Sequence, residues 1–337
     1  MSTVYGKMSD RQVEYIQSRL RYESYYKTWG YSWMKNNGYI LPMPEGILEV
    51  MEHVIQETEP ANMTKDVEEF RDLKIQIKKQ TYNVILLGRV LEFGLRDIQA
   101  WMNSSAPIGK ETSLEQATIA EFQQKLYLQL DGFTFWGTNM RDAVATDIWK
   151  GTDEITGMFN GFTAFGAGAG EDNYVDAAMD YYISVNNAVD DLVDAGYEAD
   201  SYTIFSSRAV KNDCDGGTTN HRNTTAGFKT ELREVLAKPE VDRWIASPAC
   251  LDYAQTANRM VVVPNIMNKA NVLGSENQID RGSPFAIYEE PIHVVPLYGG
   301  NLADGLKRKV AIYTALAFAQ TNTNAIVRSG TLSFTAA

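Results

Sequence analysis

The sequence predicts a mixed α+β fold in which helices and strands follow one another without a regular alternation. Two helices and several strands are clearly patterned, but they lack the βαβ rhythm of a doubly wound parallel sheet. At 337 residues the chain can bury a sizeable core, and we find no internal repeat or low-complexity tail. We therefore expect one elaborate domain or two smaller ones.

The net charge argues against one broad class of function. Aspartate and glutamate together number 43 against 31 lysines and arginines, which gives a formal net charge of −12. Proteins that grip phosphate backbones normally present a basic surface, so specific or general nucleic-acid binding is not expected. An acidic surface suits a protein that must not adhere to DNA.

The termini and the cysteines indicate a protein made in a reducing compartment. The start "MSTVYGKMSDRQ" has no apolar signal region. The longest uncharged stretches, Ile155–Gly170 and Ala311–Val327, are interrupted by polar residues and are not expected to cross a membrane. Cys214 and Cys250 stand apart, so no disulfide framework is expected.

The first 40 positions are unusually aromatic. Ser9 and Gln12 have the spacing of a capping box, which predicts a helix over 10–28. The aromatic residues that follow are Tyr15, Tyr22, Tyr25, Tyr26, Trp29, Tyr31, Trp33 and Tyr39. Such large side chains gain from burial. Two interpretations stay open: the segment packs on its own domain, or it is an arm that docks on a neighbouring chain.

The next segment predicts a short helix and then a hairpin. "ILEVMEHVIQETEP" (47–60) has the look of a helix that stops before its proline. In "RDLKIQIKK" (71–79), apolar and polar residues alternate with a period of two, as in a strand with a charged face. "YNVILLGRVLEF" (82–93) predicts a second strand. Because so much charge is left exposed, we expect these two strands to form a hairpin that projects from the body.

Two longer helices are the clearest elements. Thr112 and Glu115 form a capping box that predicts a helix over 113–132. Its apolar stripe consists of Leu114, Ile119, Phe122, Leu126 and Leu130. The second helix lies within 172–196 and should end at Gly196. Its apolar positions are Val175, Ala178, Tyr182, Val185, Val189 and Leu192.

The later part of the chain predicts further strands and two more helical segments. Strands are expected in "SYTIFSS" (201–207), "NRMVVVP" (258–264), "AIYEEPIHVVPL" (286–297) and "KRKVAIYTALAFAQ" (307–320). Helical segments are expected in "TTAGFKTELREVLA" (224–237) and near "DYAQTA" (252–257).

The glycine-rich stretch 152–173 does not have the pattern of a nucleotide site. Gly166 and Gly168 fit the first two glycines of a dinucleotide fingerprint, but Glu171 stands at the third position. Asp172 follows at the expected helix start, where a second carboxylate would repel a pyrophosphate. We interpret the stretch as a connector.

Other candidate sites are weak. Asp172, Asp176 and Asp180 share one helix face and could hold a divalent cation, although such a row is more often a solvated face. "DCDGG" (213–217) reads as a turn. The histidines, His53, His221 and His293, are scattered. We assign no catalytic, cofactor-binding or metal-binding residue, and we do not expect an enzyme.

The order of these elements resembles a known family. "ILLGRVLEFGLRDIQAWMN" precedes a capped long helix ending in "LDGFTFWGTN", and "WKGTDEITGMFNG" follows. This run is similar to the middle of major capsid proteins of tailed viruses with the Hong Kong 97-type fold, and of the related encapsulin shells. Ile155, Gly157 and Asn160 match a phrase typical of the family. The resemblance spans about residues 40–330, mostly as an order of elements.

The resemblance implies a division of the chain. The implied parts are an N-terminal arm (1–40), a peripheral domain with a long spine helix (41–61, 88–170 and 291–337), an extended hairpin or E-loop (62–87) and an axial domain (171–290). It implies a structural subunit that self-assembles through pentamers and hexamers into an icosahedral shell around a viral double-stranded DNA genome. The implied partners are further copies of the chain, a portal protein, and scaffolding or decoration proteins, with no membrane. The implied location is the virion capsid, after assembly in the host cytoplasm.

Two other interpretations stay open. An encapsulin-type cellular compartment would share the fold but enclose enzyme cargo. A metal-dependent α+β enzyme would use the face of Asp172, Asp176 and Asp180. Some relatives also cross-link their subunits through lysine and asparagine. Lys74, Lys78 and Lys79 lie on the predicted hairpin, but no catalytic glutamate is recognised, so we do not infer a cross-link.

Overall fold

The computed structural model describes residues 27–55, 77–94, 114–140, 155–164, 181–216, 230–252, 254, 256, 258–265, 285–297, 307–320 and 323–329. The helices are α2 (Trp29–Asn36), α5 (Leu114–Trp136), η3 (Gly137–Asn139), α6 (Tyr181–Asp194), α7 (Arg208–Gly216), α8 (Glu231–Leu236) and η4 (Pro248–Cys250). The strands are β1 (Ile40–Pro42), β2 (Glu49–Ile55), β3 (Ile77–Asn83), β4 (Ile85–Gly94), β5 (Thr163–Ala164), β6 (Tyr202–Ser206), β7 (Val241–Ala246), β8 (Met260–Pro264), β9 (Phe285–Glu289), β10 (His293–Leu297), β11 (Lys307–Gln320) and β12 (Val327–Arg328).

Strand β11 organises the first of two five-stranded sheets. It pairs with β4 along one edge and with β10 and then β9 along the other, while β1 adds to β9 in parallel. The inner face of β4 and β11 carries Phe93, Val310 and Ile312, against which Ile119 and Phe122 of α5 pack. The strand expected at 307–320 is therefore confirmed, and it is the centre of the sheet.

The second sheet is buried on both faces. Its strand order is β5-β12-β8-β6-β7, with β6 parallel to β7 and antiparallel to β8. Every residue of β6 and β8 is buried. Val262 and Ile204 face helices α6, α7 and α8, whereas Val261 and Phe205 face the core that contains α5. This two-sided burial explains why "MVVVP" is a continuous apolar run.

The long helix α5 confirms the strongest helical pattern. Leu126 and Leu130 of the predicted stripe are almost fully buried. The helix does not stop at Gly132 as expected but continues to Trp136, because Phe133, Phe135 and Trp136 are buried in the shared core. The capping residue Thr112 lies outside the described residues.

The phrase shared with the capsid family forms a tight turn against the end of α5. We call residues 155–162 the clasp turn. The Asn160 side chain accepts a hydrogen bond from the Gly157 N–H at 2.7 Å and donates one to the Trp136 carbonyl at 3.3 Å. A Cβ on Gly157 would lie 2.5 Å from the Phe135 backbone, so only glycine fits this approach. The motif is therefore a packing device.

The second predicted helix is confirmed as α6. Tyr181, Val185, Ala188, Val189 and Leu192 are its buried residues, so Tyr181 takes the core position expected for Tyr182. Gly196 adopts φ +84° just after the helix, which explains why the helix ends there. The part of the prediction before Tyr181 lies outside the described residues.

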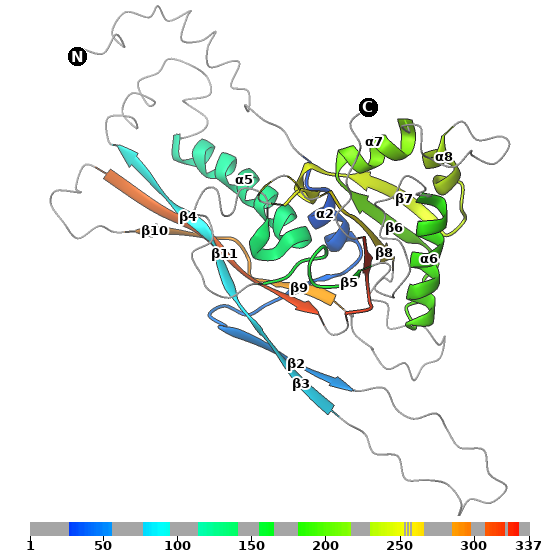
Figure 1. Cartoon of the computed structure of the whole chain (residues 1–337). Helices are drawn as coiled ribbons and strands as arrows, with labels where there is room; N and C mark the ends of the chain where they lie inside the picture. The colour runs from blue at the N-terminus through cyan, green and yellow to red at the C-terminus, as the bar shows by residue number, and fades with distance from the viewer. Residues whose placement is uncertain are drawn as a thin grey trace, which may run out of the picture.

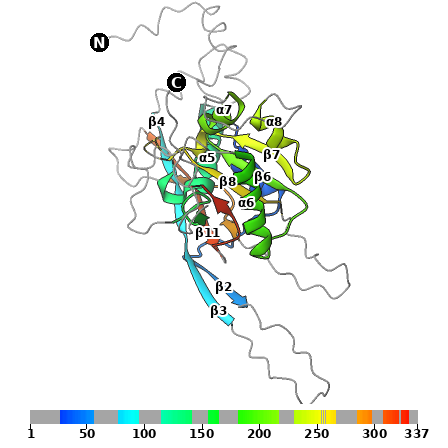
Figure 2. The same cartoon turned by 45° about the vertical axis from the view of Figure 1, so that its right-hand side comes forward.

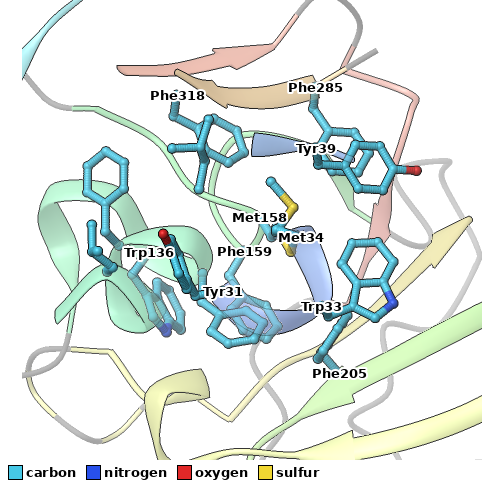
Figure 3. Packing of buried hydrophobic residues seen from close by; sticks show 14 of the residues in the cluster. Tyr31, Trp33, Met34, Tyr39, Trp136, Met158, Phe159, Phe205, Phe285 and Phe318 are labelled. Atoms are coloured by element: carbon cyan, nitrogen blue, oxygen red, sulfur yellow. The ribbon is translucent and has the colours of Figure 1, made fainter. Parts of the chain in front are cut away.

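The end of the aromatic N-terminal stretch lies in the core of its own chain. Figure 3 shows Trp33 beside Phe205 and Tyr39 beside Phe285. The Tyr39 ring stacks on Phe285 at 4.4 Å and on Trp33 at 5.2 Å. The Tyr39 hydroxyl donates to the Pro264 carbonyl at 3.0 Å. Within residues 27–40, packing on the same chain is therefore the correct interpretation, and the arm interpretation is wrong there.

A buried carboxylate on α5 anchors α2. Asp131 accepts a hydrogen bond from the Tyr31 N–H at 2.8 Å and one from the Ser247 hydroxyl at 3.4 Å. Thr28, at the start of α2, makes no side-chain cap of its own. Burial raises the pKa of Asp131 to about 6, and the N–H groups of α2 oppose that rise. Asp131 thus supplies the missing helix cap from another helix.

Several expectations were wrong. The helix expected at 47–60 is the strand β2, which pairs with β3 over Glu49–Ile55 and Ile77–Asn83. The two strands expected to pair with each other, β3 and β4, instead follow one another and take different partners, β2 and β11. Pairing with distant segments overrides the local pattern in both cases.

Two further elements differ from the sequence prediction. The turn expected at "DCDGG" is largely the end of α7, a helix that begins after Ser207, whose hydroxyl accepts from the Val210 N–H at 3.4 Å. Strand β7 was not predicted. The helix expected at 252–257 falls partly outside the described residues, and Asp252 forms a β-bridge with Met140.

The strands also cross the domain boundaries implied by the resemblance. β9 lies in the segment expected to be axial, yet it pairs with β11 in the first sheet. β12 lies in the segment expected to be peripheral, yet it pairs with β8 in the second. The implied boundaries stay a prediction, and the two sheets share one core cluster.

Candidate assembly surfaces

Strands β2 and β3 form a two-stranded ribbon that extends away from both sheets. The ribbon projects below the body in Figure 1, and the turned view of Figure 2 shows the same projection. Its seven residue pairs run in antiparallel register from Glu49–Asn83 to Ile55–Ile77. The expected projecting hairpin is therefore present, but it is built by β2 and β3.

One face of the ribbon is exposed along its whole described length. Residues that lie directly opposite each other in the register share a face. The residues of the exposed face are Glu49, Met51, His53, Ile77, Lys79, Thr81 and Asn83. Met51 is 49% exposed and Ile77 is 62% exposed. An apolar side chain on each strand is thus left in water, on a face that also carries charge.

The other face of the ribbon is anchored at its base. Val50, Tyr82 and Val84 pack with Ala315 and Ala317 of β11. The Tyr288 hydroxyl donates to Glu52 Oε1 at 2.6 Å, which joins the first sheet to the ribbon. Burial raises the pKa of Tyr82 to about 12, and the nearby charge of Glu52 adds to that rise. These contacts fix where the ribbon leaves the body.

Val84 is the point at which one extended segment changes partners. Before it, β3 pairs with β2, and after it, β4 pairs with β11. The Val84 N–H still donates to the Leu48 carbonyl at 3.1 Å, so the backbone is hydrogen-bonded across the change. The ribbon is therefore continuous through Val84 with the β4–β11 pair of the first sheet.

A second apolar surface lies on the outer face of the first sheet. We define the outer strip as Leu86, Val90, Val295 and Leu297. Val90 and Val295 lie on either side of Ala311, and Leu297 lies opposite Lys309. Leu86 is 72% exposed, and the others are between 39% and 49% exposed. Exposed apolar residues that adjoin across three strands are typical of an interaction surface.

The outer strip ends on an edge strand. β10 is the last strand on its side of the first sheet among the described residues. An edge strand presents unpaired backbone groups that can bind another chain. Val295 and Leu297 therefore combine apolar side chains with an open backbone edge.

Sequence reasoning predicted a projecting hairpin but not the residues of its exposed face, and it missed the outer strip, although a signal for that strip was available. Met51 had been placed in the expected helix at 47–60, so its exposure on a strand was not foreseen. In "ILLGRVLEF" both odd and even positions are apolar, which indicates a strand with apolar residues on both faces. Leu87 and Phe93 on one face are buried, whereas Leu86 and Val90 on the other are exposed.

The residues considered for chemistry do not come together. Among the described residues, no group of three or more histidine, cysteine, aspartate or glutamate side chains could hold a metal ion. His53 is exposed on the ribbon, and His293 stacks on Tyr313 with its Nε2 3.4 Å from Glu290. Cys214 and Cys250 are both buried, and they form no disulfide. Asp172, Asp176, Asp180, His221, Lys74, Gly166, Gly168 and Glu171 lie outside the described residues.

The lysines of the predicted hairpin are placed only in part. Lys78 and Lys79 are exposed on β3.

No helix in the described part of the chain combines the length and the apolar composition that a bilayer crossing requires.

Comparison with known proteins supports the fold through structure alone. No protein-family model matches the sequence. No curated protein matches it either. The structure is similar to the capsid of Myoviridae phage XM1, with 14% identity and a TM-score of 0.60 over 97% of this chain and 99% of that one.

Other similar structures point the same way. A structure of Gordonia phage Cozz has 11% identity and a TM-score of 0.57 over 94% of this chain and 90% of that chain. The capsid of a native GTA particle has 12% identity and a TM-score of 0.57 over 94% of each chain. The chain therefore has the α+β fold of phage capsid proteins over nearly its whole length, as the resemblance implied.

Proposed function

We propose that the chain is the structural subunit of a viral capsid and that it self-assembles into a closed shell around a double-stranded DNA genome. The observation that carries this proposal is the ribbon, whose exposed face holds Met51 and Ile77 away from the core. A monomer gains nothing in stability from apolar side chains held in water. A neighbouring copy that covered them would gain about 25 cal/mol per Å² of apolar area removed from water.

The geometry suits a heterologous contact, in which different surfaces of two copies meet. The ribbon projects, while the outer strip of Leu86, Val90, Val295 and Leu297 lies on the body. Contacts between different surfaces generate rings when the rotation between copies closes. Rings of five and six such copies would form the pentamers and hexamers of an icosahedral shell.

The role is structural, without catalysis or a cofactor. The net charge of −12 supports a structural role beside DNA, since an acidic chain binds a phosphate backbone weakly. Its site of action is the virion, after assembly in the host cytoplasm. A portal protein and scaffolding or decoration proteins are the further partners that we propose.

Electron microscopy of the protein expressed alone tests the function. We expect closed particles, or pentamers and hexamers as intermediates, by negative staining and by light scattering. A strict 38 kDa monomer over a wide range of salt and protein concentration would refute the proposal. Particles purified from the native source should contain DNA, whereas enzyme cargo would identify an encapsulin-type compartment instead.

A further inference from the structure

Two arginines lie side by side in the second sheet, where β8 begins and the antiparallel β12 ends. Arg328 belongs to β12 and pairs with Val261 of β8, and Arg259 precedes Val261 by two positions. Alternate residues of a strand point to the same face, so both side chains leave the sheet on the side of the clasp turn. The two residues are distant in sequence, and only the sheet pairing brings them together.

Both guanidinium groups are held in fixed positions by the clasp turn. Arg259 Nη1 donates to the Phe159 carbonyl at 2.7 Å, and Arg328 Nε donates to the Phe162 carbonyl at 2.8 Å. The Arg259 guanidinium also lies 5.1 Å from the centre of the Trp136 ring. Both residues are half-buried, so solvent and ligands reach part of each side chain.

Hydrogen bonds to the described residues leave most donors of this pair unused. Each guanidinium has five N–H donors, and the acceptors that they reach in the described part of the chain are the backbone carbonyls of Phe159, Phe162 and Ser329. No carboxylate lies within ion-pair distance of either arginine among the described residues. Asp252 lies near Arg259, but its oxygens accept from the Thr256 N–H at 2.8 Å and the Thr256 hydroxyl at 3.4 Å. Arg259 Nε is buried and has no hydrogen-bond partner within the described part of the chain.

The two positive charges share a partly buried environment. Burial lowers the pKa of both guanidinium groups; the charge of Arg259 lowers the pKa of Arg328 further, whereas the Asp252 carboxylate opposes the fall at Arg259. Two like charges placed together in a partly buried site cost free energy that a bound anion would recover. This arrangement is unusual in a chain whose acidic residues outnumber the basic ones by 43 to 31.

We propose that Arg259 and Arg328 form a binding site for a single oxyanion group, either a phosphate or a carboxylate. Arginine forks match the planar oxygens of such groups with paired, charge-assisted hydrogen bonds. Because the clasp turn already fixes both side chains, binding costs little further ordering. The site holds two arginines and not a basic stripe, so it suits one anionic group better than a nucleic-acid backbone.

Two sources of the oxyanion can be distinguished. One is free inorganic phosphate in solution, and the other is a side-chain carboxylate of a second copy of this chain. The first would bind dilute subunits, so its test does not depend on the proposed shell. The second would fill the site only when copies associate.

The first experiment measures the thermal midpoint of dilute full-length subunits in sodium phosphate and in sodium chloride of equal ionic strength. We expect phosphate to raise the midpoint, with half-saturation on the order of 1 mM. Arg259→Gln and Arg328→Gln should each weaken the apparent affinity about tenfold or more. Arg243→Gln removes the same charge from an exposed arginine, and its thermal midpoint should respond to phosphate as that of the wild type does.

The second experiment measures self-association by sedimentation with and without phosphate. If a carboxylate of a second copy fills the site, phosphate should compete and weaken association of the wild type but not of Arg328→Gln. If the glutamine variants fail to fold, Arg259→Lys and Arg328→Lys keep the charge and lose the fork, and the same loss of phosphate response is expected. The proposal would be overturned if phosphate changed neither the thermal midpoint nor the self-association of the wild-type protein.

Discussion

The aromatic segment around Tyr39 and the ribbon that follows it solve opposite problems. Tyr39 is fully buried between Trp33 and Phe285, and its hydroxyl reaches the backbone of β8. Ten residues later the ribbon begins, and it satisfies its backbone through β2–β3 pairing while one whole face stays in water. The first segment stabilises the subunit, whereas the second contributes little to the core and leaves a surface that we propose other copies cover. Folding and assembly should therefore be separable by mutation.

Removal of the Tyr39 side chain should have the largest effect on folding. Tyr39→Ala leaves a cavity between two aromatic rings and an unpaired carbonyl at Pro264, so we expect a loss of about 3–5 kcal/mol in the free energy of unfolding. Urea denaturation of the subunit measures it. Tyr39→Phe keeps the ring and loses only the hydrogen bond, so its cost should be about 1 kcal/mol. An equal cost for both variants would show that packing is not what the ring contributes.

The anchor of α2 should depend on pH. Asp131 has a pKa of about 6 in the folded protein, above its ordinary value of 3.8, so the folded state binds this proton more tightly than the unfolded state does. The protonated, buried carboxyl of Asp131 therefore favours the folded state at low pH, and this contribution to the free energy of unfolding is lost as pH rises from about 4 to 6. Asp131→Asn keeps an oxygen for the Tyr31 N–H and cannot ionise.

The two proteins should therefore diverge with pH. Between pH 4 and pH 7 the stability of Asp131→Asn relative to the wild type should rise by about 2.5 kcal/mol. Urea denaturation at several pH values gives the difference directly. Parallel stability curves for the two proteins would contradict the raised pKa.

The base of the ribbon should respond more weakly. Tyr288→Phe removes the hydroxyl that donates to Glu52, and we expect a loss of about 1 kcal/mol, since the site is partly exposed to solvent. Amide hydrogen exchange should increase in β2 and β3 but not in α5. Tyr313→Phe, on the same sheet but away from Glu52, is the matched control. Unchanged exchange in the ribbon would mean that apolar packing alone holds its base.

The exposed face of the ribbon should affect folding least and assembly most. Met51→Asp combined with Ile77→Asp should change the free energy of unfolding by less than about 0.5 kcal/mol, because both side chains are already exposed. Particle formation should be abolished, as seen by negative staining. Val193→Asp, an exposed apolar residue on α6, serves as the control and should still assemble. Normal particles from the double variant would exclude this face as an assembly contact.

The sequence by itself determined the elements whose patterns are local. A helix such as α5 makes its hydrogen bonds within itself, and its spacing of Leu126 and Leu130 already shows which side is buried. β11 and the buried strands β6 and β8 were likewise readable, because long apolar or alternating runs leave few other choices. The overall capsid-protein fold followed from the order of these elements.

Only the tertiary structure decided the pairings and the surfaces. β2 reads as a helix because Ile47, Met51 and Val54 have helical spacing, but its hydrogen-bond partner is β3. A strand forms its hydrogen bonds with another segment, so its identity depends on residues that the local pattern does not contain. Other features also depend on distant segments. They are the Asp131 side chain of α5 that caps α2, the exposure of Met51 and Leu86, and the position of Arg259 beside Arg328. Each of these depends on which distant segment lies next to it.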